Sequence, residues 1–507
     1  MNTAYKDFSV NYISTGLVDN AASLRKNGGQ DLYTALLIMK MFEPSQPKLQ
    51  AELGDCYYRG EGLAKNTEKA LDLFQKAAQG GSIQAQYNLG RYYYDQNEYL
   101  RAVEVFAVCL SHKNELDDYK LGRCYTYLGD AYTKISEPKT STAIEYLAIA
   151  ADKYRIGFAG RRLGRIYAQS GAHHFDPDKA IQYYELGASC GDSVSAHELG
   201  IKYILGDEAL HIEPNGKKAE SILLPFAESE EYDVLRALGQ LYQNGDSGHG
   251  LSRDYRKAKS YYERAWAINK NPDLATELGY VYYCLDEYKK AEEMLILADL
   301  TGHHDCSDFL GRMYRDGSLG EKDLNKAARY YSRAYDAGRL SNAFTYAEFA
   351  TLLEEIGDYE KAYEVAHQGD EVFNDIYFVF IKAKLVLSGK VTNKVSLDQA
   401  AEMMELCIRY DTNKEEAHMA LAKYYLSVRD FRKAEKQYMD AFALGVADAA
   451  AYLGRLYEKG GGTITADVDR AYEYYAKAAA AGSSLGEEEV SCFKKGLFGG
   501  YKRVRSL

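Results

Sequence analysis

The sequence predicts an all-α protein, a right-handed α/α superhelix built from about twelve antiparallel helix pairs with a cap at each end. Three observations support this fold class. Proline is scarce, with 7 in 507 residues and none after Pro272, and a long chain with so few helix breakers favours helices. A small residue, usually preceded by leucine, recurs at intervals of 32 to 40 residues. Self-similarity at such a period is typical of stacked repeats.

Each repeat is anchored on that small residue, which is glycine in nine units and alanine in three. Leucine precedes the anchor in ten units, and tyrosine follows it by three residues in ten. Residues four apart share one helix face, so this leucine and tyrosine predict a buried stripe. The anchors are Gly54, Gly90, Gly129, Gly164, Gly200, Gly239, Gly279, Gly311, Ala347, Ala383, Ala422 and Gly454.

A glycine inside a helix costs about 1 kcal/mol relative to alanine, so the repeat must need its small size. The expected need is the close approach of two helix backbones, with the alanine of the second helix serving the same contact. An alanine stands 12 to 19 residues after each anchor, as Ala70 follows Gly54 and Ala180 follows Gly164. Each unit is therefore predicted to be a helical hairpin, and neighbouring hairpins bury one another's apolar faces.

Residues 53–90 resemble a Sel-one-like repeat, because Gly60-Glu61-Gly62, Lys69-Ala70 and Lys76-Ala77-Ala78 stand in its register. Other units, with 12 residues between anchor and alanine, resemble tetratricopeptide repeats. The resemblance implies the following divisions: capping helices at 1–45, Sel-one-like and tetratricopeptide-like repeats at 46–346, divergent tetratricopeptide-like repeats at 347–421, further repeats at 422–484, and a terminal helix with a basic tail at 485–507.

Composition narrows the function. The net charge of -12 disfavours the binding of nucleic acid, which is itself negatively charged. No segment has the length and apolarity of a membrane span, and the N-terminus does not read as a signal peptide. Eight scattered cysteines suggest neither disulfides nor a zinc site, and favour a reducing cytoplasm. No catalytic residue, metal ligand or cofactor is predicted, and His303-His304-Asp305-Cys306 is interpreted as a turn rather than a metal site.

The resemblance implies that the first helix of each hairpin lines the concave groove of the superhelix, where a partner segment would bind. The candidate binding residues are therefore taken from these first helices. Positions one and four after the anchor, and three before it, face away from the buried stripe. Tyrosine and arginine at such positions are typical of binding hot spots. Arginine also binds carboxylates through two parallel hydrogen bonds. A solvated face with internal ion pairs is the alternative interpretation. The first candidate group is Tyr58, Tyr87, Arg91, Tyr94, Arg161 and Arg165, and the second is Tyr280, Tyr283, Arg312, Arg315 and Phe344.

These features predict a non-enzymatic scaffold or adaptor of the cytoplasm, and the resemblance to bacterial forms of these repeats implies a bacterial setting. Its expected partner is another protein or peptide with an acidic or C-terminal carboxylate segment. A regulatory receptor for a short peptide is the alternative, and single-stranded nucleic-acid binding is less favoured. An enzyme is disfavoured because the repeats occupy nearly the whole chain, which leaves no separate catalytic domain.

Overall fold

The computed structural model describes Leu36, Lys40 and residues 46–496 and 499–505. The predicted N-terminal capping helices fall almost wholly outside these described residues. Within them the chain forms 25 α-helices, with adjacent helices packed in antiparallel pairs. The predicted all-α repeat solenoid is thereby confirmed, and twelve successive pairs correspond to the twelve predicted units.

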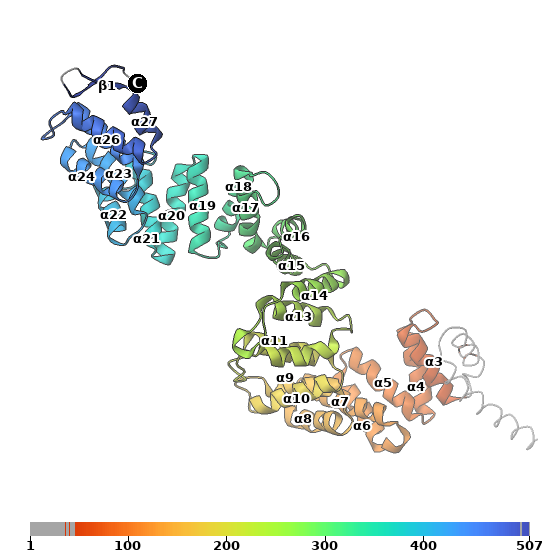
Figure 1. Cartoon of the computed structure of the whole chain (residues 1–507). Coiled ribbons are helices and arrows are strands. Elements are labelled where there is room, and N and C mark those ends of the chain that lie inside the picture. Colours follow the sequence, from red (N-terminus) through yellow and green to blue (C-terminus); the bar gives the residue numbers. More distant parts are fainter. Residues whose placement is uncertain (1–35, 37–39, 41–45, 497–498, 506–507) are drawn as a thin grey trace, which may run out of the picture. The chain divides into compact units, whose positions relative to one another are not determined.

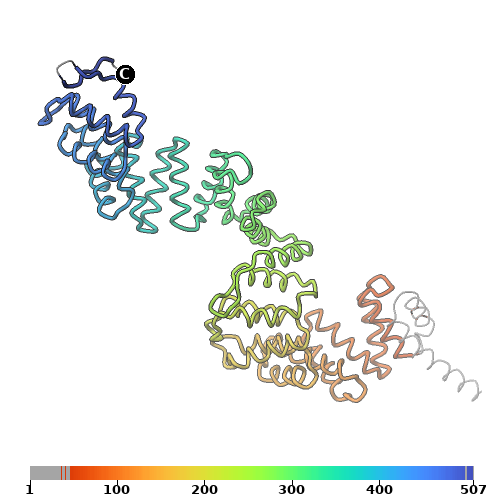
Figure 2. Tube along the Cα trace, in the orientation of Figure 1, coloured from red at the N-terminus to blue at the C-terminus, as the bar shows by residue number. Residues whose placement is uncertain are grey.

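The chain divides into two compact units, residues 1–270 and 271–507. In each, the backbone runs up one helix and down the next (Figures 1 and 2). In the first unit the first helices of the pairs are α3 (Pro47–Arg59), α5 (Ile83–Asp95), α7 (Asp118–Lys134), α9 (Gly157–Tyr167), α11 (Ser193–Leu205) and α13 (Tyr232–Asn244). Their second helices are α4 (Thr67–Gln79), α6 (Tyr99–Ser111), α8 (Thr140–Ala148), α10 (Pro177–Ser189), α12 (Gly216–Leu223) and α14 (Tyr255–Ile268).

The second unit repeats this arrangement and ends in a small hairpin. Its first helices are α15 (Pro272–Cys284), α17 (Ser307–Asp316), α19 (Ala343–Ile356), α21 (Ile376–Leu387), α23 (Lys414–Ser427) and α25 (Ala447–Lys459). Its second helices are α16 (Tyr288–Leu300), α18 (Leu324–Asp336), α20 (Tyr359–Phe373), α22 (Leu397–Arg409), α24 (Phe431–Ala443) and α26 (Val468–Ala480). They are followed by α27 (Ser484–Ser491), β1 (Phe493–Lys495) and β2 (Tyr501–Arg503).

The glycine anchors lie where a large side chain of the second helix packs on the first. A Cβ added at Gly164 would lie 2.8 Å from the ring of Tyr184, and one at Gly311 would lie 2.9 Å from the ring of Tyr331. Both rings stand four residues after the alanine of their second helix. The predicted approach of two backbones is therefore wrong, because the group that needs the space is an aromatic or leucine side chain of the second helix.

One backbone hydrogen bond recurs in eleven pairs and fixes their register. The N–H of the residue that caps the second helix donates to the carbonyl three residues after the anchor, as in Asp323 to Tyr314 at 2.9 Å. In the pair α19/α20 the same bond joins Asp358 to Leu353 at 2.8 Å. Leu353 therefore occupies the tyrosine position, and the anchor of this pair is Ala350.

The predicted anchor Ala347 is thus wrong by three residues. Ala350 is fully buried, whereas Ala347 is partly exposed. Phe349 replaces the usual leucine and stacks on Tyr331 of the preceding pair, with ring centroids 5.7 Å apart. Both positions carry alanine. Because this pair lacks the leucine before the anchor and the tyrosine after it, only the repeat spacing was left to choose between them, and it favoured Ala347.

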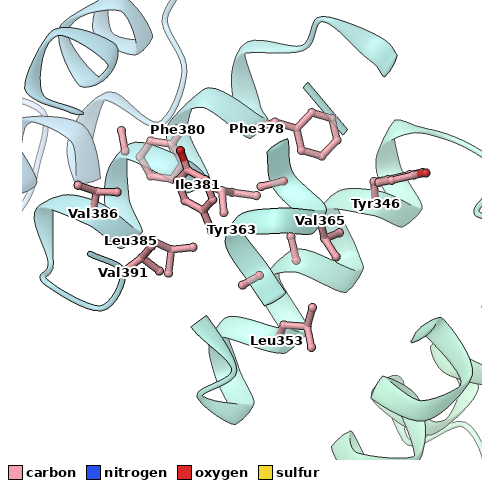
Figure 3. Close-up of a cluster of buried hydrophobic side chains, with 14 of the residues drawn as sticks. Tyr346, Leu353, Tyr363, Val365, Phe378, Phe380, Ile381, Leu385, Val386 and Val391 are labelled. Atoms are coloured by element: carbon pink, nitrogen blue, oxygen red, sulfur yellow. The ribbon is translucent and has the colours of Figure 1, made fainter. Parts of the chain in front are cut away.

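Figure 3 shows buried side chains of this divergent stretch. They belong to one core cluster that also includes Tyr314 and Tyr331 before the stretch and Tyr425 and Ala434 after it. Phe378 and Ile381 of α21 are buried, and Phe378 packs where Gly369 of α20 leaves room. Phe380, three residues before the anchor Ala383, is 2% exposed, so it belongs to the core. Helices without the repeat's usual residues therefore still bury a full apolar face.

The basic segment after α27 forms an antiparallel hairpin rather than an open tail. Phe493 pairs with Arg503, and the Val504 N–H donates to the Cys492 carbonyl at 2.7 Å. Phe493 is buried, and Tyr501 stacks on Tyr472 with centroids 3.5 Å apart. Apolar residues interspersed among the lysines hold the segment down, which its charge alone did not suggest.

All eight cysteines are free thiols, and six of them are buried. Among the described helices, none has the length and apolarity needed to cross a bilayer. The thiols serve as small core residues, as Cys56 and Cys124 do in α3 and α7.

Candidate functional site

A pocket of about 770 Å³ lies over three consecutive first helices of the second unit, α17, α19 and α21. Its apolar wall includes Phe344 and Tyr377, and the Phe344 side chain is 63% exposed. With Phe349 and Ala350 in register, Phe344 stands six residues before its anchor, and Tyr377 stands six before Ala383. The two aromatic residues therefore occupy equivalent positions in neighbouring repeats. An open pocket that displays a large aromatic ring is a surface suited to binding.

Charged side chains surround this apolar wall. Four carboxylates and two cations line the pocket, and two of these residues, Arg315 and Glu348, pair with each other at 3.3 Å. The complete lining is Arg315, Asp316, Lys322, Leu324, Ala343, Phe344, Ala347, Glu348, Thr351, Glu355, Asp375, Tyr377 and Phe378.

The second candidate group gathers partly at this pocket. Arg315 and Phe344 line it, and the Arg312 guanidinium lies 5.5 Å from the Phe344 ring centre. Tyr280 and Tyr283 do not line the pocket; they pack on Phe309, with centroids 5.2 and 5.4 Å apart.

Both arginines of this group are held by one carboxylate. Glu348 of α19 lies 3.1 Å from Arg312 and 3.3 Å from Arg315, which are residues of α17. The Tyr331 hydroxyl also donates to Glu348 at 3.3 Å. The pairs cross from one repeat to the next, so they join neighbouring first helices.

The first unit has equivalent inter-repeat pairs. Arg165 follows its anchor by one residue and Glu198 precedes the next anchor by two, and the Arg165 Nε–H donates to Glu198 Oε1 at 3.0 Å. Asp130 and Arg162 occupy the same two positions one repeat earlier and also pair. Arg312 and Glu348 repeat the arrangement in the second unit. We call these cross-repeat pairs the charge ladder.

The pKa of Glu198 reflects its place in the charge ladder. Burial raises the pKa of this carboxyl, but the hydrogen bond and the positive charge of Arg165 outweigh burial, so the pKa lies below its ordinary value of 4.5. A carboxylate with a lowered pKa contributes stability above the unfolded-state value, and that contribution is lost as the pH falls through the lowered pKa. The Arg165–Glu198 pair is therefore formed at neutral pH.

The other residues of the first group also find partners within the chain. Arg91 lies 3.4 Å from Asp55 and 5.5 Å from the Tyr58 ring centre. Arg161 lies 3.3 Å from Asp192. Tyr58 donates to Asp95, and Tyr94 donates to the buried Asp130.

Tyr87 departs from the expectation that it faces outward, because it is only 6% exposed and packs against Phe106 of α6. The candidate arginines of the first group thus form ion pairs within the chain, as the alternative interpretation expected. Their use by a partner stays a proposal.

Sequence reasoning missed Tyr377 and the pocket carboxylates Asp316, Glu355 and Asp375. The position six before the anchor was not among those considered, and it carries aspartate in four other repeats: Asp233, Asp273, Asp305 and Asp448. In the remaining repeats the same position carries Lys48, Gln84, Arg123, Phe158, Val194 and Glu416. The residue type at this position therefore did not mark the pocket. Opposite charges one after an anchor and two before the next would have marked the charge ladder.

The described residues contain no group of three or more histidine, cysteine or carboxylate side chains placed to hold a metal ion. His303 and His304 instead lie against Asp273 and Asp299, at 2.6 and 2.9 Å. The run 482–486 has the glycine-serine-glycine spacing of a hydrolase elbow. It lies in a helix–helix turn and the start of α27 rather than between a strand and a helix, and Ser483 caps α27.

Comparison with known proteins finds the Sel1 repeat in seven stretches. They are residues 47–82, 83–101, 118–154, 161–192, 233–265, 307–338 and 447–483. The longest of the unmatched stretches, residues 339–446, includes the divergent stretch 347–421.

Three curated proteins are similar to parts of the chain. The ERAD-associated E3 ubiquitin-protein ligase component HRD3B of Arabidopsis thaliana is 26% identical over 239 residues, 46% of this chain and 32% of that protein. The chitin synthase regulator SKT5 of Saccharomyces cerevisiae is 26% identical over 223 residues, 41% and 31% of the two chains. The putative sel1-like repeat-containing protein L21 of Acanthamoeba polyphaga mimivirus is 32% identical over 118 residues, 23% and 21%. The chain thus spans a third or less of these relatives.

Among solved structures, a protective antigen of uropathogenic Escherichia coli strains that displays an SLR fold matches 90% of this chain and 89% of its own. The TM-score is 0.56 and the sequence identity 22%. At this identity the likeness concerns the fold alone.

Proposed function

The chain is a Sel1-like repeat protein, and from that premise we propose that it is a non-enzymatic scaffold that holds a segment of a partner protein against the first helices of its second unit. Sel1 repeat proteins serve in protein–protein interaction. Two of the relatives are named as a ligase component and a synthase regulator, rather than as enzymes in their own right. Both names fit a protein that acts by contact.

The observation that carries this proposal is the pocket over α17, α19 and α21, with its exposed Phe344. Exposed aromatic rings beside a hollow are typical anchors of protein interfaces. The pocket draws on three consecutive repeats, so an extended or helical segment that crosses several repeats can fill it.

An acidic or carboxylate-terminated partner, as expected from the sequence, stays a proposal. Such a partner would have to compete with ion pairs that already exist within the chain. The arginines that suggested it, among them Arg165, Arg312 and Arg315, are already paired with Glu198 and Glu348. An acidic segment must displace these carboxylates, and the exchange of one carboxylate for another gains little. The cytoplasmic setting likewise stays a proposal, to which the free thiols lend support, and so does the bacterial setting.

Replacing Phe344 tests the proposal. Dodecapeptides selected from a random display library on the full chain are expected to bind Phe344→Ala at least tenfold more weakly than the wild type, because truncating a hot-spot aromatic costs about 2 kcal/mol or more. Titration of each labelled peptide by fluorescence anisotropy measures the change.

Leu397→Ala is the matched control, since Leu397 is 48% exposed and lies outside the pocket lining. The control should bind like the wild type. If the selected peptides bind Phe344→Ala and wild type equally, the pocket is not the binding site and the proposal fails.

A further inference from the structure

We propose that the partner segment held by this pocket is basic, with arginine or lysine next to a bulky apolar side chain. The inference rests on the proposed function and adds the chemistry of the ligand. It follows from which charged groups at the pocket are compensated within the chain and which are not.

The positive charge of the pocket wall is partly compensated, because Arg315 and the adjacent Arg312 share the carboxylate of Glu348. Arg315 faces Glu348 at 3.3 Å and donates to the Thr351 hydroxyl at 3.3 Å. Lys322 is the other cation of the lining. An incoming anion therefore meets one lysine and an arginine already held by a carboxylate.

The negative charge is less well compensated. Asp316 and Glu355 are both exposed, and neither forms an ion pair within the described residues. Asp375 caps α21 by accepting the backbone N–H of Tyr377 at 2.9 Å, a contact that leaves its charge without a cation. Three carboxylates thus face the pocket without a cationic partner, on two successive first helices and at the start of a third.

A second hollow of about 760 Å³ adjoins the first and shares Lys322, Leu324 and Glu355 with it. It too has four carboxylates and two cations. Its carboxylates are Glu292, Glu321, Asp323 and Glu355, and its cations are Lys322 and Lys326. A segment that leaves the pocket past Glu355 would therefore continue along a negatively charged surface.

A basic side chain with an apolar neighbour satisfies both parts of this surface. A guanidinium bonds a carboxylate through two N–H groups and also packs on aromatic faces. The pocket lining includes both kinds of group, the carboxylates of Glu355 and Asp375 and the rings of Phe344 and Tyr377. The chain's net charge of -12 adds a longer-range attraction for cations.

Charge reversal at the pocket tests the inference. Peptides selected on the wild-type chain should carry net positive charge beside an aromatic or aliphatic residue. Their affinity for the double variant Asp316→Lys/Glu355→Lys should fall at least tenfold, and it should weaken as salt rises. Glu402→Lys/Glu473→Lys changes the net charge equally at exposed sites outside both hollows, and it should change affinity less than twofold.

The result separates the inference from the proposed function. If the selected peptides depend on Phe344 but are acidic or neutral, or bind the pocket reversal as tightly as the wild type, the basic ligand is refuted while the pocket stands. If the distant reversal weakens binding as strongly as the pocket reversal, only net charge matters and the inference is again refuted. Circular dichroism of both variants checks that the repeats remain folded.

Discussion

Leucine at position 350 is expected to destabilise the second unit by about 1–3 kcal/mol, the usual cost of added methylene groups in a packed core. Ala350 is fully buried and takes the place of the glycine anchor, where the pair α19/α20 closes. A larger side chain there has to push α20 away or leave its preferred rotamer. The shift in the urea unfolding midpoint of the full chain, with amide hydrogen exchange in α19 and α20, measures the effect.

Ala347→Leu is the matched control, three residues away on the same helix. Ala347 is partly exposed and lines the pocket, so the same added volume has room to extend outward. Its unfolding free energy should change by less than about 0.5 kcal/mol, as is usual for surface substitutions. If Ala347→Leu is the more damaging of the two, the register assigned to this pair is incorrect.

Arg162→Met is expected to destabilise the first unit by about 2–3 kcal/mol. The Asp130 carboxylate is 1% exposed, and Arg162 is its cross-repeat partner. Removing one partner of a buried pair costs about 3–5 kcal/mol because the other charge is left uncompensated. Lys134, 3.0 Å from Asp130, and the Tyr94 hydroxyl reduce that cost here. Faster amide exchange in α7 and α9, and a lower urea midpoint, would report it.

Arg256→Met serves as the control for this prediction. Arg256 lies exposed on α14 of the same unit and forms no ion pair within the described residues. Its loss should alter stability by less than about 0.5 kcal/mol. Equal effects of the two substitutions would mean that the charge ladder contributes nothing beyond an ordinary surface arginine.

The fold could be predicted because one steric requirement recurs. A second-helix side chain needs room at each anchor, and glycine at Gly54, Gly164 or Gly311 records that need in the sequence. Where alanine stands at both 347 and 350, either residue leaves space, and the sequence no longer distinguishes them. The bond from Asp358 to Leu353 does distinguish them, and it becomes visible only in three dimensions.

The candidate site was harder to predict because exposure depends on the neighbouring repeat. Arg312 does lie away from the buried stripe, as its position implied, but Glu348 of the next repeat reaches it. Tyr87 was expected to face outward and is buried by Phe106 of its own pair. Tyr377 lies at the pocket from a position that single-repeat periodicity gave no reason to consider. Each outcome depends on side chains from adjacent helices, which the pattern of one repeat does not contain.

Hydrogen–deuterium exchange of the full chain, with and without a saturating selected dodecapeptide, tests most directly that partner segments are held on the first helices of the second unit. The account predicts slower exchange in α17, α19 and the start of α21, with α22, α24 and the first unit unchanged. Slower exchange confined to other helices, with those three unaffected, would contradict it.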